Sequence, residues 1–222
     1  MIIDCIADLH GFYPELEGGD LLFVAGDLTG NDSFDQWDEF FNWLDLASDK
    51  YNRICVIAGN HDNALIMSSN RFRYLRREEC VSYLEDSGAE FQGFKIWGSP
   101  WTKTFEGMNP HCKAFTCDTE EELAEKWALI PDDVDILITH APLFGILDEV
   151  KDYYSRNIIN TGSQSLSKRI TELKNIKLHI FGHIHENGGI WKANLNRRLV
   201  YVNASHVNEL YKPVNRPVRI EL

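Results

Sequence analysis

The stretch "LHIFGHIHENGG", from Leu178 to Gly189, places two histidines one residue apart directly after a short apolar run. In an extended segment residues i and i+2 point to the same side, whereas on a helix they point well apart. His183 and His185 therefore present two imidazoles on one side of a strand end, with glycines around them. Either the pair belongs to a surface turn or it is part of a functional site, and the rest of the chain decides between these interpretations.

An apolar run followed by a polar cluster occurs five times along the chain. The runs are rich in Ile, Val and Leu, which is typical of strands buried on both faces. Open α/β sheets bind ligands at the carboxyl ends of their strands, so five such clusters in order predict one functional site. The clusters are Asp8-Leu9-His10-Gly11, Gly26-Asp27, Gly59-Asn60-His61-Asp62, His140-Ala141-Pro142 and Gly182-His183-Ile184-His185.

Helical periodicity lies between some of these strands. Ser33 to Ala47 carries apolar residues at helical spacing, with Ser33 or Asp32 as its N-cap, and Thr119 to Ile130 begins with a capping-box pair. A third helix is expected from Ser163 to Lys174. Strands that alternate with helices predict an α/β fold. Shorter strands from Val81 to Trp97 and in the C-terminal tail predict a second sheet.

The composition predicts one globular domain over residues 1–222, with 44% hydrophobic and 25% charged residues. A net charge of −12 disfavours long nucleic acids and acidic membranes as partners, and favours a small substrate. Five cysteines, an odd number, indicate buried thiols in a reducing compartment. With no signal-peptide pattern and no long apolar run, we expect a cytoplasmic protein without a membrane span.

The polar clusters supply seven candidate metal ligands with oxygen or imidazole donors and no thiolate. Such a set suits Mn, Fe, Zn or Ni and argues against a structural zinc site built from cysteines. Seven donors are too many for one tetrahedral ion, whereas two ions that share a carboxylate accommodate them. The candidates are Asp8, His10, Asp27, Asn60, His140, His183 and His185.

These motifs resemble those of the calcineurin-like binuclear metallophosphoesterases, which read D-x-H, G-D, G-N-H-[DE], a lone H after a strand, and G-H-x-H. All five are intact and in order here. Longer stretches such as "WGSPW", "ITHAPLFGILD" and "YVNAS" resemble the small metallophosphoesterase-domain-containing subgroup, which is associated with phosphodiesterase activity, including on cyclic nucleotides. The resemblance implies a four-layer α/β-β/α sandwich of two mixed sheets flanked by helices, with the metal site at the carboxyl ends of the strands.

The resemblance also implies two divalent cations, with manganese as the first choice, and a role for each ligand. A hydroxide that bridges the ions would attack a small phosphodiester, with a cyclic-nucleotide-type substrate as the leading candidate. The implied division is Asp8, His10 and His185 for the first ion, Asn60, His140 and His183 for the second, and Asp27 as the bridge.

Two further residues of the "GNHD" motif are predicted to be catalytic. His61 follows a ligand, and as an imidazolium it would stabilise the phosphate or protonate the leaving oxygen. Asp62, next in sequence, is predicted to orient His61, although aspartate also caps turns and helices well.

Several alternatives stay open at this point. The same site would serve a phosphomonoesterase or a dinucleoside-polyphosphate hydrolase, because specificity comes from the surrounding loops. A catalytically silent scaffold on the same fold is less favoured, since no ligand and no catalytic histidine is lost. The segment Arg71 to Glu79, with four arginines, is either a solvated surface or an arm that contacts phosphate or a partner. The oligomeric state and the role of His206 are not determined.

Overall fold

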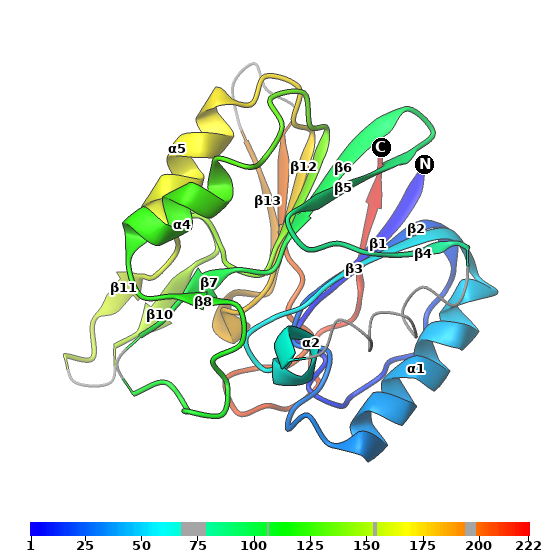
Figure 1. Cartoon of the computed structure of the whole chain (residues 1–222), viewed down its shortest axis with the longest axis horizontal. Coiled ribbons are helices and arrows are strands. Elements are labelled where there is room, and N and C mark those ends of the chain that lie inside the picture. The colour runs from blue at the N-terminus through cyan, green and yellow to red at the C-terminus, as the bar shows by residue number, and fades with distance from the viewer. Residues whose placement is uncertain (68–78, 106, 153–154, 194–198) are drawn as a thin grey trace.

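Two mixed β-sheets lie face to face, and helices cover their outer faces (Figure 1). The computed structural model describes residues 1–67, 79–105, 107–152, 155–193 and 199–222. Residues 71–78 of the arginine-rich segment therefore lie outside the described residues. The predicted four-layer α/β-β/α sandwich is confirmed.

The first sheet has the strand order β15-β1-β2-β3-β4. Its parallel strands are β1 (Ile2–Ile6), β2 (Gly19–Ala25), β3 (Tyr51–Ile57) and β4 (Val81–Tyr83), and β15 (Val218–Glu221) pairs antiparallel with β1. Because β1, β2 and β3 are parallel neighbours, the three polar clusters that follow them meet at one edge.

The second sheet has the order β13-β14-β12-β9-β6-β5, with four parallel strands in the middle and one antiparallel strand at each edge. β9 and β12 are neighbours, so the motifs that follow them also lie side by side. The strands are β5 (Ser87–Phe91), β6 (Phe94–Ser99), β9 (Ile136–Thr139), β12 (Leu178–Phe181), β13 (Gly189–Lys192) and β14 (Val200–Asn203).

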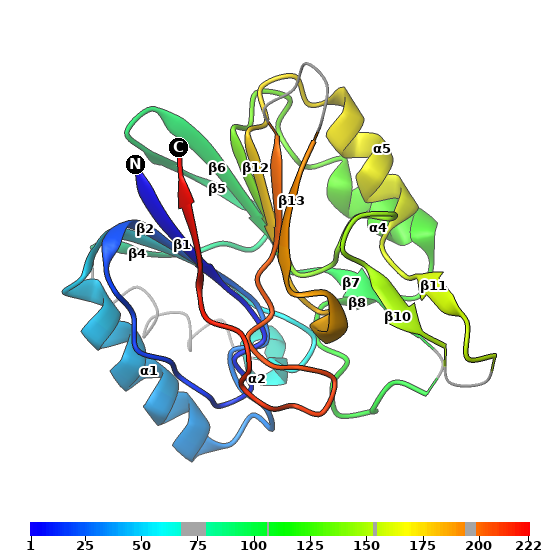
Figure 2. The ribbon, with the colours of Figure 1, turned by 180° about the vertical axis from the view of Figure 1, so that it is seen from behind.

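Two small strand pairs lie at the end of the second sheet where the short 3-10 helix η1 (His185–Asn187) follows β12 (Figure 2). β7 pairs with β8 in parallel, and β10 pairs with β11 in antiparallel orientation. Their bounds are Thr102–Lys103, Thr116–Cys117, Glu149–Lys151 and Ile158–Asn160.

The three predicted helices are present, and a short α2 (Asn63–Met67) follows the "GNHD" loop. α1 (Phe34–Ser48) covers the first sheet, while α4 (Glu120–Trp127) and α5 (Gln164–Glu172) cover the second. The predicted caps form, since Ser33 accepts a hydrogen bond from the Gln36 amide and the capping box of α4 is complete. The predicted end of α4 at Ile130 was wrong, because a turn begins after Trp127.

The apolar residues form three layers that alternate with the sheets. The central layer joins the two sheets through residues such as Phe23, Ile138 and Ile180. Trp37 and Phe40 of α1 pack on the outer face of the first sheet. Phe34 is 78% exposed and does not belong to this buried face of the helix. Because both faces of each sheet are covered, the strand ends form a rigid base for the loops. Within the described ranges, every helix is too short or too polar to span a lipid bilayer.

Candidate active site

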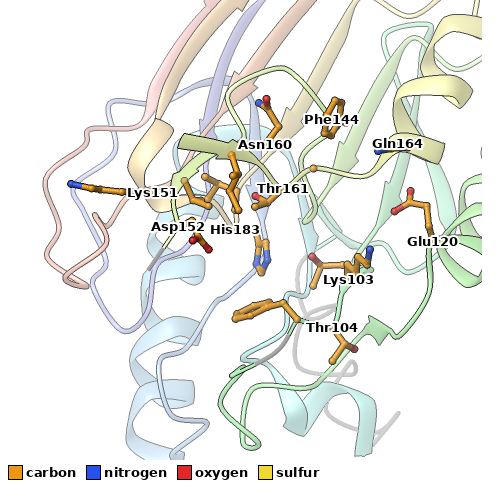
Figure 3. A pocket seen from close by; sticks show the side chains of 16 residues that line it. Lys103, Thr104, Glu120, Phe144, Lys151, Asp152, Asn160, Thr161, Gln164 and His183 are labelled. Carbon is orange, nitrogen blue, oxygen red and sulfur yellow. The ribbon is translucent and has the colours of Figure 1, made fainter. Parts of the chain in front are cut away.

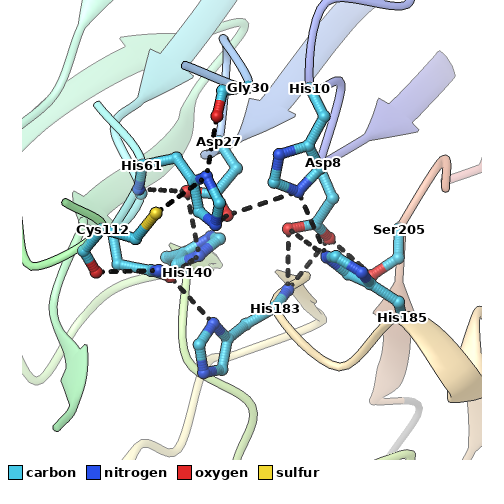
Figure 4. Close-up of polar contacts among 12 residues, drawn as sticks. Asp8, His10, Asp27, Gly30, His61, Cys112, His140, His183, His185 and Ser205 are labelled. Carbon is cyan, nitrogen blue, oxygen red and sulfur yellow. Dashed lines mark hydrogen bonds and ion pairs between the residues drawn. The ribbon is translucent and has the colours of Figure 1, made fainter. Parts of the chain in front are cut away.

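The structure brings all seven predicted ligands together at the carboxyl ends of the parallel strands (Figure 4). The ligands follow five strands that belong to two different sheets, so neither sheet alone forms the site. The donors fall into two adjacent groups. The strands that precede them are β1 for Asp8 and His10, β2 for Asp27, β3 for Asn60, β9 for His140, and β12 for His183 and His185.

The first group contains Asp8, His10, Asp27 and His185. One ligand atom from each lies within 4.8 Å of all the others. The Nε2 atoms of His10 and His185 are 3.2 Å apart, and His10 Nε2 is 3.6 Å from Asp27 Oδ2. Bonds of about 2.1 Å to a tetrahedral ion give ligand separations of about 3.4 Å. These residues therefore fit a divalent cation.

The second group contains Asn60, His140 and His183, again with Asp27. Asn60 Oδ1 lies 3.0 Å from both His140 Nε2 and His183 Nδ1. His140 Nε2 lies 3.5 Å from Asp27 Oδ1. The two carboxylate oxygens of Asp27 thus face different groups, Oδ2 toward His10 and Oδ1 toward His140.

Hydrogen bonds on the far side of two of these ligands set which atom faces the site. Asn60 Nδ2 donates to the Cys112 carbonyl (3.2 Å), which turns Oδ1 toward the imidazoles. His140 Nδ1 donates to the Ala25 carbonyl (3.0 Å), so Nε2 of the neutral ring is an acceptor. Two acceptors that face each other at 3.0 Å repel unless a cation or a proton lies between them. This second group also fits a cation.

The electrostatics of the site favour positive charge. Burial opposes ionisation of Asp27 and Asp8, but the neighbouring histidines outweigh it, so the pKa of Asp27 falls well below its usual range and that of Asp8 to about 2. Burial lowers the pKa of His183 to about 3, which keeps this ring neutral and available as a ligand. For His140, burial is outweighed by the charges of Asp27 and Asp8, which raise its pKa to about 9. The surroundings of His140 therefore favour positive charge at this position.

Four of the ligands hold a left-handed backbone conformation that non-glycine residues seldom adopt. The φ angles are 51° at Asp8, 45° at His10, 52° at Asp27 and 70° at His183. Such conformations cost about 1–3 kcal/mol each and cluster at functional sites. The fold therefore holds these side chains in place against local backbone preference.

Gly182 is expected to be required for the first metal position, because a Cβ there would lie 2.4 Å from Asp8 Oδ2. Gly182→Ala should displace this carboxylate and weaken binding of the first ion about tenfold to hundredfold. Calorimetric titration with Mn²⁺ measures the loss. Gly189→Ala is the matched control from the same motif, because a Cβ there meets nothing within 4 Å. Equal Mn²⁺ affinity in the two variants would contradict the prediction.

His61 lies beside the donor groups, with its ring centroid 4.5 Å from that of His10 (Figure 4). Its Nε2 is 3.9 Å from Asp27 Oδ2, and its Nδ1 contacts the Gly30 carbonyl (3.2 Å) and Cys112 Sγ (3.4 Å). If Nδ1–H donates to the Gly30 carbonyl, Nε2 faces the donor groups. The carbonyl of Gly30 therefore supplies the orientation that was expected from Asp62.

The structure corrects the predicted partner of Asp62, because no hydrogen bond joins it to the His61 ring among the described residues. Its buried carboxylate instead accepts backbone N–H groups of Leu28, Thr29 and Gly59 at 2.8–3.2 Å. Burial and the charge of Asp27 raise the pKa of Asp62, while these amides oppose the rise. Asp62 thus links the loop after β2, which carries Asp27, to the loop after β3, which carries Asn60, through these hydrogen bonds.

Two residues that the sequence did not single out also border the ligands. Ser205 Oγ donates to Asp8 Oδ2 (2.5 Å), and it follows β14, so the same strand-end pattern could have found it. Tyr211 packs its ring edge-on against His10 and His185, with centroids 4.9 and 5.2 Å away. Tyr211 comes from a loop without any periodic pattern, and no sequence signal marked it. His206 lies outside the donor groups and bonds the Asn215 carbonyl through Nδ1 (2.6 Å).

A two-sheet α/β sandwich with two adjacent groups of aspartate, asparagine and histidine donors at its strand ends defines a metal-dependent phosphoesterase. The chain belongs to the calcineurin-like phosphoesterase family, whose sequence profile matches residues 1–187. Members of this family are binuclear metal-dependent phosphoesterases, so membership indicates metal-dependent hydrolysis of phosphoesters.

Individual relatives support this assignment. Metallophosphoesterase domain-containing protein 1 of Homo sapiens is 34% identical over 241 residues, which cover 98% of this chain and 70% of that protein. UPF0046 protein K07C11.7 of Caenorhabditis elegans is 29% identical, over 96% of this chain and 72% of that protein. The predicted likeness to the metallophosphoesterase-domain-containing subgroup is therefore confirmed.

Solved structures share the fold at low sequence identity. TT1561 of Thermus thermophilus superposes with a TM-score of 0.60 at 16% identity, over 93% of this chain and 89% of that one. Purple acid phosphatase PPD1 from seeds of yellow lupin (Lupinus luteus) gives a TM-score of 0.50 at 15% identity, over 97% of this chain and 46% of that one. These likenesses concern the fold alone.

Proposed function

We propose that this protein hydrolyses a small phosphodiester, with cyclic nucleotides as the first candidates, at a centre of two divalent cations. The observation that carries the proposal is the position of Asp27, whose two oxygens face two separate donor groups. A carboxylate in this position would hold two cations at once, one through each oxygen. Manganese is the first choice, because carboxylate, amide and imidazole donors suit it.

The residues of the site divide the work of binding and proton transfer. When bound, two such cations lower the pKa of a water molecule toward neutrality and offset negative charge on the phosphate. Asp8, His10 and His185 would hold one cation, and Asn60, His140 and His183 the other. A cavity of about 250 Å³ beside both groups, lined among others by Asp27 and His61, accommodates the phosphate.

His61 donates the proton that the reaction needs at the leaving oxygen. The contact of Nδ1 with the Gly30 carbonyl directs Nε2 toward Asp27 and the cavity. An alkoxide is a poor leaving group, so protonation by Nε2–H contributes most for alkyl esters such as those of a ribose. Ser205 and the His183 amide both donate to the Asp8 carboxylate, which holds it in its ligating orientation.

Reconstitution with Mn²⁺ followed by a comparison of substrates tests this proposal. We expect hydrolysis of bis(4-nitrophenyl) phosphate and of at least one cyclic nucleotide at rates well above that of 4-nitrophenyl phosphate. A monoester rate that exceeds the diester rates by a large factor would replace the diesterase assignment with a phosphomonoesterase. No turnover of any ester by the metal-loaded protein would instead favour a silent scaffold.

The two histidines of "GHIH" are expected to serve different ions. His185 Nε2 belongs to the group around Asp8 and His10, whereas His183 Nδ1 faces Asn60. His185→Ala should therefore weaken the first ion and His183→Ala the second. Metal content per chain and the electron paramagnetic resonance signal of coupled Mn²⁺ pairs measure this. Two fully occupied, coupled Mn²⁺ ions in either variant would contradict the division.

A further inference from the structure

A second and larger cavity, of about 690 Å³, is lined by His183, one of the proposed ligands (Figure 3). It borders the phosphate cavity, because four residues line both: Phe105, Val150, His183 and Ile184. Its walls come from the β7 strand and the β10–β11 pair, which lie outside the two main sheets. Its volume is in the range of sites for small organic ligands.

Two phenylalanine side chains give the cavity an apolar wall. Phe105 is 54% exposed and Phe144 is 42% exposed, although both are large hydrophobic residues. The Phe105 ring stands edge-on to the His183 imidazole, with centroids 6.4 Å apart. An apolar ring this close to a proposed metal ligand can contact a group that is attached to the bound phosphate.

Lys103 adds a positive charge to the same cavity. Its side chain lies among the lining residues between His183 and Glu120 (Figure 3), and the described residues offer it no ion pair. Glu120 lines the same cavity but forms no ion pair with Lys103 among the described residues, and its carboxylate accepts hydrogen bonds from Ser163 Oγ (2.5 Å) and the Ser165 amide (2.8 Å). In a chain of net charge −12, a lysine that forms no ion pair with any described residue and lies beside a phosphate site favours an anionic or polar ligand.

The opposite end of the site offers less room. The Tyr211 ring packs against His10 and His185 and is about half exposed, so it covers the side of the first donor group. A bulky substituent on the phosphorus is therefore directed past His183 into the larger cavity. The two ends of the site therefore differ in size.

We propose that the 690 Å³ cavity binds the larger organic arm of the substrate, a planar aromatic group that carries an anionic or carbonyl oxygen. The aromatic ring packs against Phe105, and the oxygen accepts a hydrogen bond from Lys103 Nζ. This inference rests on the proposed function, because it assumes that phosphate binds between the donor groups. It adds the class of substituent and the residues that select it.

Calorimetric titration of the Mn²⁺-loaded protein with three ligands tests the inference without turnover. The ligands are inorganic phosphate, phenyl phosphate and 4-carboxyphenyl phosphate. We expect the affinity to rise in that order, since each ligand adds one contact. Phe105→Ala should weaken both aryl phosphates about tenfold and leave inorganic phosphate unchanged. Lys103→Met should weaken only 4-carboxyphenyl phosphate, also about tenfold.

Lys151→Met is the matched control, because Lys151 lines the same cavity but its side chain extends away from the other lining residues (Figure 3). This variant should bind all three ligands as the wild type does. Aryl phosphates that bind no more tightly than inorganic phosphate, or an equal loss in the two lysine variants, would overturn the inference and leave the proposed hydrolysis intact. Selective aryl binding without turnover of any ester would contradict the proposed function alone.

Discussion

Asp27→Asn is expected to abolish hydrolysis, with a fall in kcat of at least about 10³-fold. Asp27 has one oxygen 3.6 Å from His10 Nε2 and the other 3.5 Å from His140 Nε2. The amide has a single oxygen and no charge, so it can serve one cation at most. A pair of cations supplies several kcal/mol of transition-state stabilisation, which corresponds to three or more factors of ten in rate. Steady-state kinetics and metal content per chain measure both effects.

Asp86→Asn provides the control for this change. Asp86 is a half-buried carboxylate that accepts hydrogen bonds from Ser99 Oγ and Trp101 Nε1, away from the donor groups. We expect this variant to keep two ions per chain and near-wild-type rates. If Asp27→Asn also retained two tightly bound ions, the carboxylate would not be the bridge.

His61→Ala is expected to keep both metals and lose about 10²–10⁴-fold in turnover of a cyclic nucleotide. The contact that supports the bridge survives the change, because Asp27 Oδ1 accepts from the backbone N–H of residue 61 (2.9 Å) and not from the ring. Hydrolysis of bis(4-nitrophenyl) phosphate should fall by less than about tenfold, since 4-nitrophenolate leaves without protonation. The ratio of the two losses is the measured quantity.

His111→Ala is the matched histidine control, because His111 is exposed and does not line the phosphate cavity. Both rates should stay unchanged in this variant. Equal losses on the two substrates in His61→Ala would show that His61 stabilises the phosphate and does not protonate the leaving oxygen. A near-wild-type rate on the cyclic nucleotide would remove His61 from the mechanism.

The proposed ligand set could be read from sequence because each ligand lies within four residues of a strand end. An apolar run predicts a buried strand, and parallel strands bring their carboxyl ends to one edge. The helix caps at Ser33 and Thr119 are equally local, and both form as predicted. A pattern contained in a few consecutive residues does not depend on the rest of the fold.

The partner of Asp62 could not be predicted in this way. Sequence adjacency suggested His61, but neighbouring residues in a turn need not direct their side chains together. The carboxylate instead reaches amides about 33 residues away in the chain, at Leu28 and Thr29, because β2 and β3 are paired in parallel. The Gly30 carbonyl takes the expected position beside His61 for the same reason.

The sequence alone therefore determined the type of fold, the donor chemistry and the family, because all three depend on local patterns at strand ends. Only the tertiary structure decided what surrounds the donors. Ser205, Tyr211 and the cavity beside Lys103 come from segments far apart in the chain, and they meet through the packing of two sheets. Packing between distant segments has no periodic signature in the sequence. In this protein such packing positions the residues that are proposed to select the substrate.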